Sequence, residues 1–479
     1  MTTNTKSSRT WVLALTAAAS LMVALDALVV TTALSTIRLD LGASIEELEW
    51  TVNAYTLSFA VLLMTAAALG DRFGRRRLFT LGLALFAAAS AACALAPGVG
   101  WLIAARAIQG AGAALVTPLS LALLSAAFPP ERRAAAMGIF SGVTGLAVLG
   151  GPVVGGAITQ GLAWQWIFWL NVPLGLVTIP LVLARIEESR GPRSALDVPG
   201  LALVTGAALG VVWGLVRGNA AGWGSLEVAG ALAAGMVLAV AFVAWELRAR
   251  EPMLPMPLFR SRAFSSGNAA VFFLFGSLFG AVFFMAQFLQ TAQGDGPLEA
   301  GLRLLPWTAT LFVVAPVAGG LVARVGERRF IAGGLLLQAI GMAWIAAIAT
   351  PDVAYLELVP PLVVAGAGVS MAMPATQSVV VNAVAPQHIG KATGTFSTMR
   401  QLGGAFGLAV LVAVFAGAGG YASAGTFSDG FAAAIAVSAG LSLAGAVAGA
   451  ALPARRREVA AETTVMGGHA APGTASPGR

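Results

Sequence analysis

The chain has 479 residues, of which 58% are hydrophobic and 10% are charged, and its mean hydropathy is +0.85. Soluble proteins carry about 25% charged residues, so this composition excludes a soluble globular protein. The single cysteine, Cys93, excludes a disulfide scaffold. The apolar residues come in blocks of about 20, the length that crosses a bilayer as a helix. The sequence therefore predicts an all-α polytopic membrane protein.

Fourteen such blocks follow one another along the chain. An even number of spans puts both termini on the same side of the membrane. The first block follows Lys6 and Arg9 and is interpreted as an uncleaved first span, because its apolar run is longer than that of a signal peptide. The predicted spans are residues 11–36, 50–70, 78–96, 101–127, 134–158, 165–185, 198–216, 226–245, 264–291, 301–323, 330–349, 356–384, 392–416 and 430–452.

The basic residues are unevenly divided between the two sets of loops. Of the 28 Lys and Arg residues, only Arg38, Arg217 and Arg303 fall in the loops of one side. Basic residues accumulate in cytoplasmic loops, so both termini are predicted to be cytoplasmic and the protein to lie in the cytoplasmic membrane. This asymmetry also accounts for the net charge of +7 without a nucleic-acid partner.

An internal repeat divides the chain. Residues 110–141 match residues 366–397, and residues 68–77 match residues 320–329. Two six-helix repeats are a transporter arrangement, with the substrate cavity between them. The predicted parts are an N-terminal half (1–190), an extra two-helix hairpin with its linkers (191–254), a C-terminal half (255–452), and a tail (453–479) rich in Ala, Gly and Pro that is expected to be disordered.

The loop after the second span is rich in arginine, and Asp71 is its only acid. Asp71 can accept charge-assisted hydrogen bonds, or cap a helix across the seam between the halves, and so latch one conformation. Gly74 permits a tight turn. The alternative is that these are ordinary basic residues near helix ends. The candidate gating residues are Gly70, Asp71, Arg72, Gly74, Arg75 and Arg76.

Asp26 is predicted to be the only acid deep inside a span. A carboxylate at the centre of a bilayer costs about 2.5–3.5 kcal/mol on insertion scales, which makes Asp26 a candidate functional residue. Burial disfavours the charged form, so Asp26 is expected to exchange protons. The alternative is a structural acid bonded to a hydroxyl group such as that of Thr31.

Two further spans carry candidate residues. Arg106 and Gln109 lie in the span 101–127, where Arg106 either tunes the proton site electrostatically or extends its charge to the interface. The span 134–158 contains small residues that let helices approach closely. The candidates are Gly151, Gly155 and Gly156, which form a thin face, and Pro152, which weakens the helix backbone between them.

These motifs resemble those of the fourteen-helix drug:proton antiporter family of the major facilitator superfamily. The resemblance covers about residues 10–452 and includes the segment 164–175 and Arg400 in the span 392–416. It implies a rocker-switch fold and export of lipophilic compounds driven by the proton gradient, with no cofactor. Ala67 stands where the family's loop pattern has Gly, and Ala323 replaces the acid in the second copy, so the first copy is expected to dominate gating.

Other function classes find little support. The sequence has no GxxxxGK[ST] phosphate loop for ATP coupling, and its two histidines and one cysteine offer no metal-ligand pattern. Neither an intramembrane enzyme nor a receptor would account for the motif set. A facilitator or symporter of a polar metabolite or sugar stays as the alternative, and it would need more polar residues in its cavity.

The expected substrate is a neutral or singly cationic lipophilic molecule. This follows from one acid in a cavity expected to be apolar and aromatic, because an unpaired second charge there would be costly. Residues Phe272, Phe283, Phe284 and Met285 are expected to contribute to that cavity. The other expected partners are protons and the lipid bilayer, and the protein is expected to be a monomer.

Overall fold

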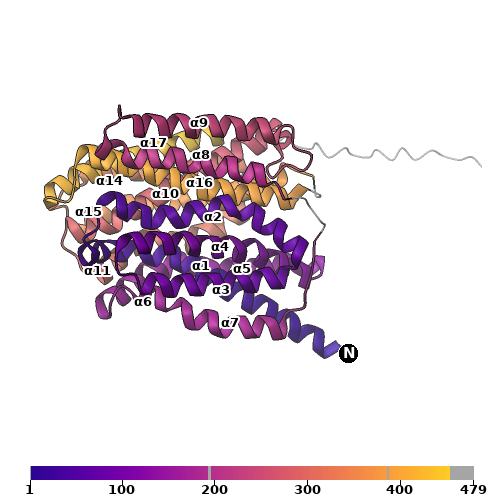
Figure 1. The fold of residues 1–479 in the computed structure, drawn as a ribbon. Coiled ribbons are helices and arrows are strands. Elements are labelled where there is room, and N and C mark those ends of the chain that lie inside the picture. Colours follow the sequence, from indigo (N-terminus) through magenta and orange to yellow (C-terminus); the bar gives the residue numbers. More distant parts are fainter. Residues whose placement is uncertain (1, 192–195, 386–387, 454–479) are drawn as a thin grey trace, which may run out of the picture.

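The computed structural model of the protein describes residues 2–191, 196–385 and 388–453 (Figure 1). These residues form helices joined by short loops, with no strand among them. Fourteen of the helical segments are long and apolar enough to cross a membrane, as predicted. The expectation of a disordered tail concerns residues 454–479, which lie outside the described residues.

The first six spans are built from seven helices. The sixth span is divided into a short helix and a longer one. The helices are α1 (Thr2–Leu41), α2 (Ile45–Phe73), α3 (Arg75–Ala94), α4 (Val99–Ala127), α5 (Pro130–Gly161), α6 (Trp166–Trp169) and α7 (Asn171–Arg185).

A helical hairpin and a second set of spans complete the fold. The hairpin consists of α8 (Val198–Ala221) and α9 (Leu226–Glu246), and a 3₁₀ helix, η1 (Met256–Arg260), follows it. The remaining helices are α10 (Arg262–Thr291), α11 (Pro297–Arg303), α12 (Leu305–Thr308), α13 (Thr310–Val325), α14 (Glu327–Ile348), α15 (Tyr355–Asn382), α16 (Ile389–Ala418) and α17 (Ala424–Ala450).

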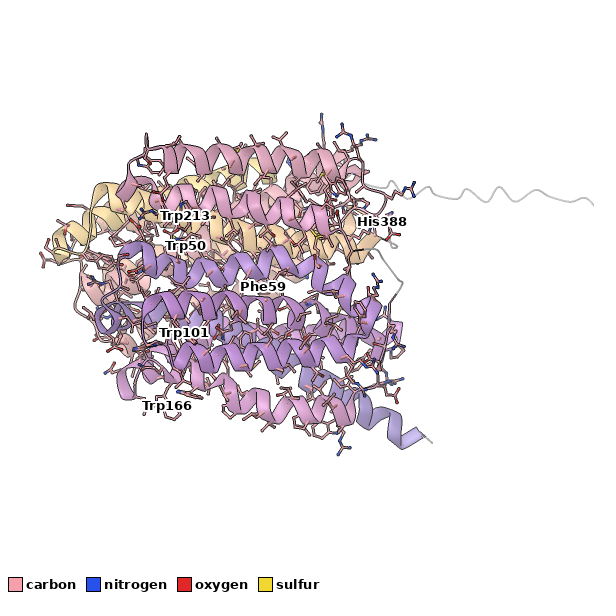
Figure 2. All side chains as sticks on the ribbon, viewed as in Figure 1. Trp50, Phe59, Trp101, Trp166, Trp213 and His388 are labelled. Carbon is pink, nitrogen blue, oxygen red and sulfur yellow. The ribbon has the colours of Figure 1, made fainter. Side chains whose placement is uncertain are left out.

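We name the two ends of the bundle by the residues they carry. The proximal end carries Thr2, Asp71 and His388, and the distal end carries Arg38, Ser44 and Tyr421. Figure 2 shows Trp50, Trp101, Trp166 and Trp213 towards the distal end and His388 at the proximal end. Tryptophans gathered at one level of a bundle are typical of a membrane interface.

The second span begins earlier than predicted. Ser44 caps α2 by accepting a hydrogen bond from the backbone of Glu47, and the Glu47 side chain accepts one from the backbone of Ser44. This reciprocal capping box satisfies two amide groups that the helix start leaves free. The helix therefore starts at Ile45 and places Glu49 inside a span, whereas the sequence analysis put Glu49 in a loop.

The α8–α9 hairpin lies along one side of the bundle (Figure 1). Val212 and Val216 of α8 are buried in one cluster with Leu57 of α2 and with Ala405 and Ala409 of α16. The hairpin therefore covers the line along which α2 of the first set of spans meets α16 of the second.

The buried apolar residues show where the two sets of spans meet. One large core gathers distal residues from both sets, including Val30 and Leu34 of α1 and Phe284 and Phe288 of α10. Towards the proximal end there are instead separate cores, one made only of residues before 190 and one only of residues after 260. The structure is therefore closed at the distal end by packing between the two sets.

Matched glycines of the predicted internal repeat make similar close contacts. A Cβ atom on Gly110 would lie 2.3 Å from the carbonyl oxygen of Tyr55, and one on Gly366 would lie 2.4 Å from that of Trp307. Both glycines thus let the fourth helix of a repeat approach the second. Gly74 and Gly326 also share a positive φ, 115° and 97°, where one helix ends and the next begins.

Candidate functional site

Asp26 lies at the centre of a buried hydrogen-bond network. Its side chain is 1% exposed. One carboxylate oxygen accepts a hydrogen bond from Nη1 of Arg106 at 2.5 Å, and the other accepts from Nε2 of Gln109 at 2.8 Å. The structure thus brings together the three residues that the sequence analysis proposed as the proton site, from α1 and α4.

Arg106 is held on several sides. Its side chain is 1% exposed, and its Nε donates to the carbonyl oxygen of Thr51 at 3.1 Å. The guanidinium group lies over the ring of Tyr55, 4.2 Å from the ring centre, and Nη1 also donates to Oε1 of Gln109. A cation on an aromatic face gains about 2 kcal/mol or more when desolvated. Arg106 therefore does not extend to the interface, and that alternative is wrong.

Two members of the network were not identified from the sequence. Nδ2 of Asn171, the first residue of α7, donates to Asp26 at 2.9 Å and to the hydroxyl of Ser90 at 2.9 Å. The same hydroxyl accepts a hydrogen bond from Gln109. Asn171 lies in the segment 164–175 that supported the family resemblance, and an Asn next to a Pro-rich helix start is the signal that could have indicated it.

The geometry defines the charge state of the pair. Arg106, Gln109 and Asn171 all donate to Asp26, and a carboxyl group that only accepts hydrogen bonds is ionised. Thr31 bonds the carbonyl oxygen of Leu28 instead, so the suggested hydroxyl partner for Asp26 is wrong. The site in this conformation is a buried ion pair between Asp26 and Arg106.

Two further acids, which the sequence analysis placed in loops, are buried near the ends of spans. Glu49 of α2 is 0% exposed and Glu246 at the end of α9 is 2% exposed. Glu49 was placed in a loop because the apolar block was taken to start at residue 50, whereas the capping box starts the helix at Ile45.

The arginine-rich loop is organised within the first set of spans. The carboxylate of Asp71 binds Nε and Nη2 of Arg75, each at 2.8 Å, and the backbone oxygen of Asp71 accepts from Gly191. Gly70 packs directly against Leu119 of α4, and Arg72 lies over the ring of Phe73. In the part of the chain that is described, Asp71 caps no helix across the seam, so that form of the latch is wrong for this conformation.

Glu188 supplies the helix cap that Asp71 does not. Its carboxylate accepts hydrogen bonds from the backbone amides of Arg76 and Arg77, at 2.9 and 3.2 Å, in the first turn of α3. The Arg76 side chain also donates to the carbonyl oxygen of Ile186 at 3.2 Å. A carboxylate at a helix start satisfies free amides and the helix dipole. The loop is therefore tied to the segment that leaves α7.

The small residues of α5 lie where three helices meet. Cβ atoms on Gly151 and Gly155 would collide with Leu28 and with the carbonyl oxygen of Val29 on α1. A Cβ on Gly156 would lie 2.3 Å from the carbonyl oxygen of Pro297, at the start of α11. Pro152 faces the same helix, since its carbonyl oxygen lies 2.4 Å from the Cβ position of Gly301. This motif therefore forms part of the distal contact between the two sets of spans.

The sequence profile of the Major Facilitator Superfamily matches residues 16–408 and 269–474. The chain belongs to the major facilitator superfamily. It is 37% identical to the tetracenomycin C resistance and export protein of Streptomyces glaucescens over 82% of this chain and 73% of that protein.

Other relatives and solved structures agree with this membership. The chain is 35% identical to the multidrug resistance protein Stp of Mycobacterium tuberculosis, over 82% of this chain and 74% of that protein. It is 36% identical to the cephamycin export protein CmcT of Amycolatopsis lactamdurans, over 86% of each. The crystal structure of the peptide transporter POT in complex with sulfate has the same fold, with a TM-score of 0.66, 16% identity, and coverage of 91% of this chain and 93% of that one.

In this member of the major facilitator superfamily, Arg400 differs from Arg106 in having no acidic partner. Its guanidinium carbon lies 5.7 Å from the centre of the Phe275 ring on α10, and its Nε is a buried donor without an acceptor. Among the described residues no ion pair involves Arg400. The side of α16 that faces α10 therefore carries an uncompensated positive charge.

The expected aromatic cavity residues have another role. Phe283, Phe284 and Met285 are buried in the distal core shared by both sets of spans, where Phe284 lies 4.8 Å from Phe415, centre to centre. Phe272 packs against Phe406 of α16. In this conformation Phe283, Phe284 and Met285 close the distal end rather than line a cavity.

The described residues contain no group of three or more His, Cys, Asp or Glu side chains that could hold a metal ion.

Proposed function

We propose that this protein is a proton-coupled antiporter that exports lipophilic compounds across the cytoplasmic membrane by alternating access. The observation that carries the proposal is the buried Asp26–Arg106 pair, which joins α1 to α4, together with the packing of the two sets of spans at the distal end. The relatives support export as the direction, because their names describe antibiotic or multidrug export and resistance.

The orientation is part of the proposal. The proximal end, with the arginine-rich loop of α2 and α3, faces the cytoplasm, as do both termini, because basic residues are retained on that side. The distal end then faces outwards. The structure corresponds to a state closed to the outside, and the two halves, residues 1–190 and 255–452, move as units around the hairpin 191–254.

The coupling runs through α1. Protonation of Asp26 removes its negative charge and so ends the ion pair with Arg106, while Arg106 keeps the carbonyl oxygen of Thr51 and the face of Tyr55. The same helix carries Val30 and Leu34 in the distal core, and its Thr32 carbonyl oxygen accepts a hydrogen bond from Gln290 of α10. Breaking or forming the Asp26–Arg106 ion pair therefore acts on α1, which helps to close the distal end.

The charges favour neutral substrates. The sequence suggested neutral or singly cationic compounds, on the basis that Asp26 is free to bind a cation. Asp26 is instead neutralised by Arg106, and Arg400 adds a positive charge without an acid. A cation would have to displace Arg106 before it met a carboxylate, so we propose that neutral lipophilic molecules bind best. The protein needs no cofactor besides the proton gradient and acts as a monomer.

The test is export from cells that lack other efflux systems. A protonophore should stop export, whereas ATP depletion with the proton gradient held constant should not. Asp26→Asn should abolish export against a gradient at equal membrane levels, and Asp352→Asn, at an exposed loop acid, should not. Export that survives the protonophore but not ATP depletion would refute the proposal. Uptake of a sugar or other polar metabolite in place of export would favour the facilitator or symporter.

A further inference from the structure

Glu49 is a buried acid that the Asp26 site does not use. Its side chain is fully buried in α2, and its Oε1 accepts a hydrogen bond from Nδ2 of Asn53 at 2.9 Å. Its Oε2 has no hydrogen-bond partner, and neither does Oδ1 of Asn53, which is also fully buried. Two adjacent acceptor atoms thus lack a donor.

Glu49 faces the seam between the two halves. Glu49, Asn53 and Leu57 follow one another at four-residue steps, which places them on one face of α2. Leu57 packs in one cluster with Val212 of α8 and Ala405 of α16. The face that carries Glu49 is therefore directed to the line where α2, α8 and α16 meet.

The arginines on the helices around Glu49 form no ion pair with it. On α4, Arg106 binds Asp26, and on α8, Arg217 binds Glu227 and Glu46 at 3.0 and 3.1 Å. Arg400 of α16 lies over Phe275. The nearest acid on its own helix is Glu46, one turn away, and Glu46, Arg38 and Tyr421 are the titratable groups that line the pocket beside this turn.

A single proton on Glu49 removes its buried charge and gives Oδ1 of Asn53 a donor. An ionised carboxylate buried without a cation is strongly disfavoured, so the neutral carboxyl form is preferred here. The Asn53 amide presents its Nδ2 to Glu49, or its Oδ1 after rotation by half a turn. A protonated Glu49 then donates its O–H to Oδ1 of Asn53.

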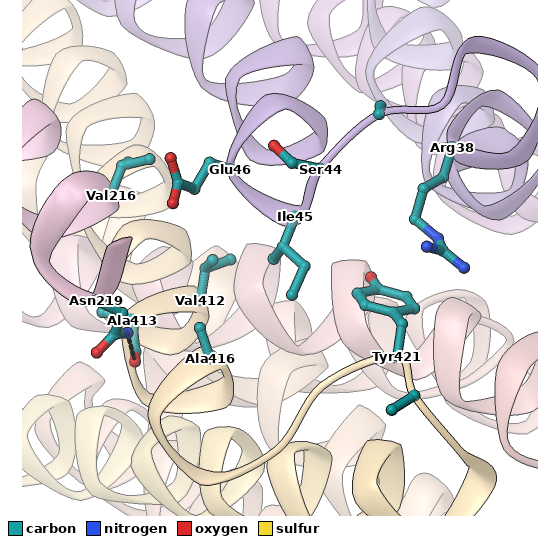
Figure 3. Close-up of a pocket in the computed structure, with 12 residues that line it drawn as sticks. Arg38, Ser44, Ile45, Glu46, Val216, Asn219, Val412, Ala413, Ala416 and Tyr421 are labelled. Carbon is teal, nitrogen blue, oxygen red and sulfur yellow. Dashed lines mark hydrogen bonds between the residues drawn. The ribbon is translucent and has the colours of Figure 1, made fainter. Parts of the chain in front are cut away.

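A pocket brings water close to this pair. A cavity of about 370 Å³ opens at the distal end between the α1–α2 loop, α8, α16 and the loop before α17 (Figure 3). It exceeds the roughly 30 Å³ that one water molecule occupies in the liquid. Glu46 lines it, and Glu46 and Glu49 are one helical turn apart on the same side of α2.

The opposite wall of the pocket is polar as well. Arg38 of α1 lies over the ring of Tyr421, 4.2 Å from its centre, and the Tyr421 hydroxyl donates to Gln287 of α10. Burial raises the pKa of Tyr421 despite the nearby Arg38, so its hydroxyl stays protonated. Polar groups of Arg38, Glu46 and Tyr421 thus line the pocket one helical turn from Glu49.

We propose that Glu49 is a second proton-binding site, separate from Asp26, which exchanges its proton with water in the distal pocket. In the exchange, a hydronium ion in the pocket gives a proton to the Glu49 carboxylate: one O–H bond of hydronium breaks, one O–H bond forms on Glu49 to give the neutral carboxyl, and a water molecule remains. Glu49 is protonated in this distally closed conformation, so closing the distal end at the α2–α16 seam takes up one proton. The functional meaning of this site rests on the proposed proton-coupled export, but its protonation does not.

Infrared spectroscopy of the full-length protein in lipid tests the protonation directly. The carbonyl band of a protonated carboxyl should be lost in Glu49→Gln and kept in Glu357→Gln, which changes an exposed acid at the same end. Asn53→Leu keeps Glu49 but removes its partner, and the band should shift. A band unchanged in Glu49→Gln overturns the proposal, as does an unshifted band in Asn53→Leu.

Exchange in heavy water tests the route. The same band shifts when O–H becomes O–D, and Ala416→Trp, which fills the pocket, should slow that shift relative to the wild type. Ala418→Trp, exposed on the same helix end, is the matched control and should leave the rate unchanged. Equal rates in Ala416→Trp and wild type overturn the pocket route. Suppose that export does not depend on the proton gradient, but the carboxyl band is lost in Glu49→Gln. This result would refute the proposed function and would still support Glu49 as a proton-binding site.

Discussion

The Asp26–Arg106 pair can be tested by neutralising each partner separately and then both. Asp26→Asn leaves the guanidinium group of Arg106 buried without its acid, and Arg106→Gln leaves the carboxylate of Asp26 buried without its cation. Because both side chains are almost fully buried, solvent cannot compensate either charge. Each single substitution should destabilise the protein, whereas the double variant contains no buried charge at this place.

The magnitude follows from the cost of leaving one charge unpaired. Removing one partner of a buried ion pair costs about 3–5 kcal/mol, while replacing both partners by neutral groups is often nearly neutral. The double variant should therefore be more stable than either single variant. The coupling energy should be of the order of 2–3 kcal/mol or larger, near the upper end for residues in one network. The remaining amides, Gln109 and Asn171, can still bond the new side chains.

Unfolding of the purified variants in detergent, followed by intrinsic fluorescence, gives the four free energies. Asp26→Asn/Arg106→Gln should unfold after both single variants, and none of the variants that lack Asp26 should export against a gradient. Thr31→Val is the control, because its hydroxyl bonds only its own helix. Additive destabilisation, with the double variant least stable, would show that the two side chains do not form an ion pair in the folded protein.

Three further predictions concern the seam, the loop and the substrate. Gly156→Leu should force α5 away from Pro297, which opens the distal end to thiol reagents directed at an introduced cysteine and reduces export. Gly161→Leu is the control, because the space around Gly161 is open, and it should have neither effect. Equal labelling of the cysteine in both variants would contradict the close contact. Glu188→Ala should cost about 1 kcal/mol in thermal unfolding because α3 loses its cap, and the exposed neighbour change Glu187→Ala should cost little. Among dyes of similar size, neutral dyes should be exported faster than dicationic ones. Arg400→Gln should reduce this difference in export rate. Faster export of dicationic dyes by the wild type would refute the charge argument.

The sequence predicted the fold well because membrane spans obey strong, local rules. Fourteen long apolar blocks had to become helices, since every backbone polar group in the hydrocarbon must be satisfied within its own segment. The repeat was equally visible, because Gly110 and Gly366 are both required where two backbones approach within a side chain's width. Asp26, Arg106 and Gln109 were identified because polar groups in apolar spans are costly.

The parts that failed depend on partners that sequence spacing does not show. Asn171 and Ser90 are ordinary polar residues until the folding of α3 and α7 brings them to Asp26. Glu188 lies more than a hundred residues from the helix it caps. Glu49 was placed in a loop because hydropathy marks where apolar residues begin, whereas a helix begins at its cap.

Transport by the purified protein under an imposed pH gradient tests the central claim most directly. Proteoliposomes that contain only this protein and a neutral fluorescent substrate should accumulate the substrate against its gradient when protons flow the opposite way. Accumulation should vanish when the pH gradient is collapsed and in Asp26→Asn, which should still equilibrate substrate or bind it. Accumulation without a pH gradient, or undiminished accumulation by Asp26→Asn, would contradict proton-coupled export through this site.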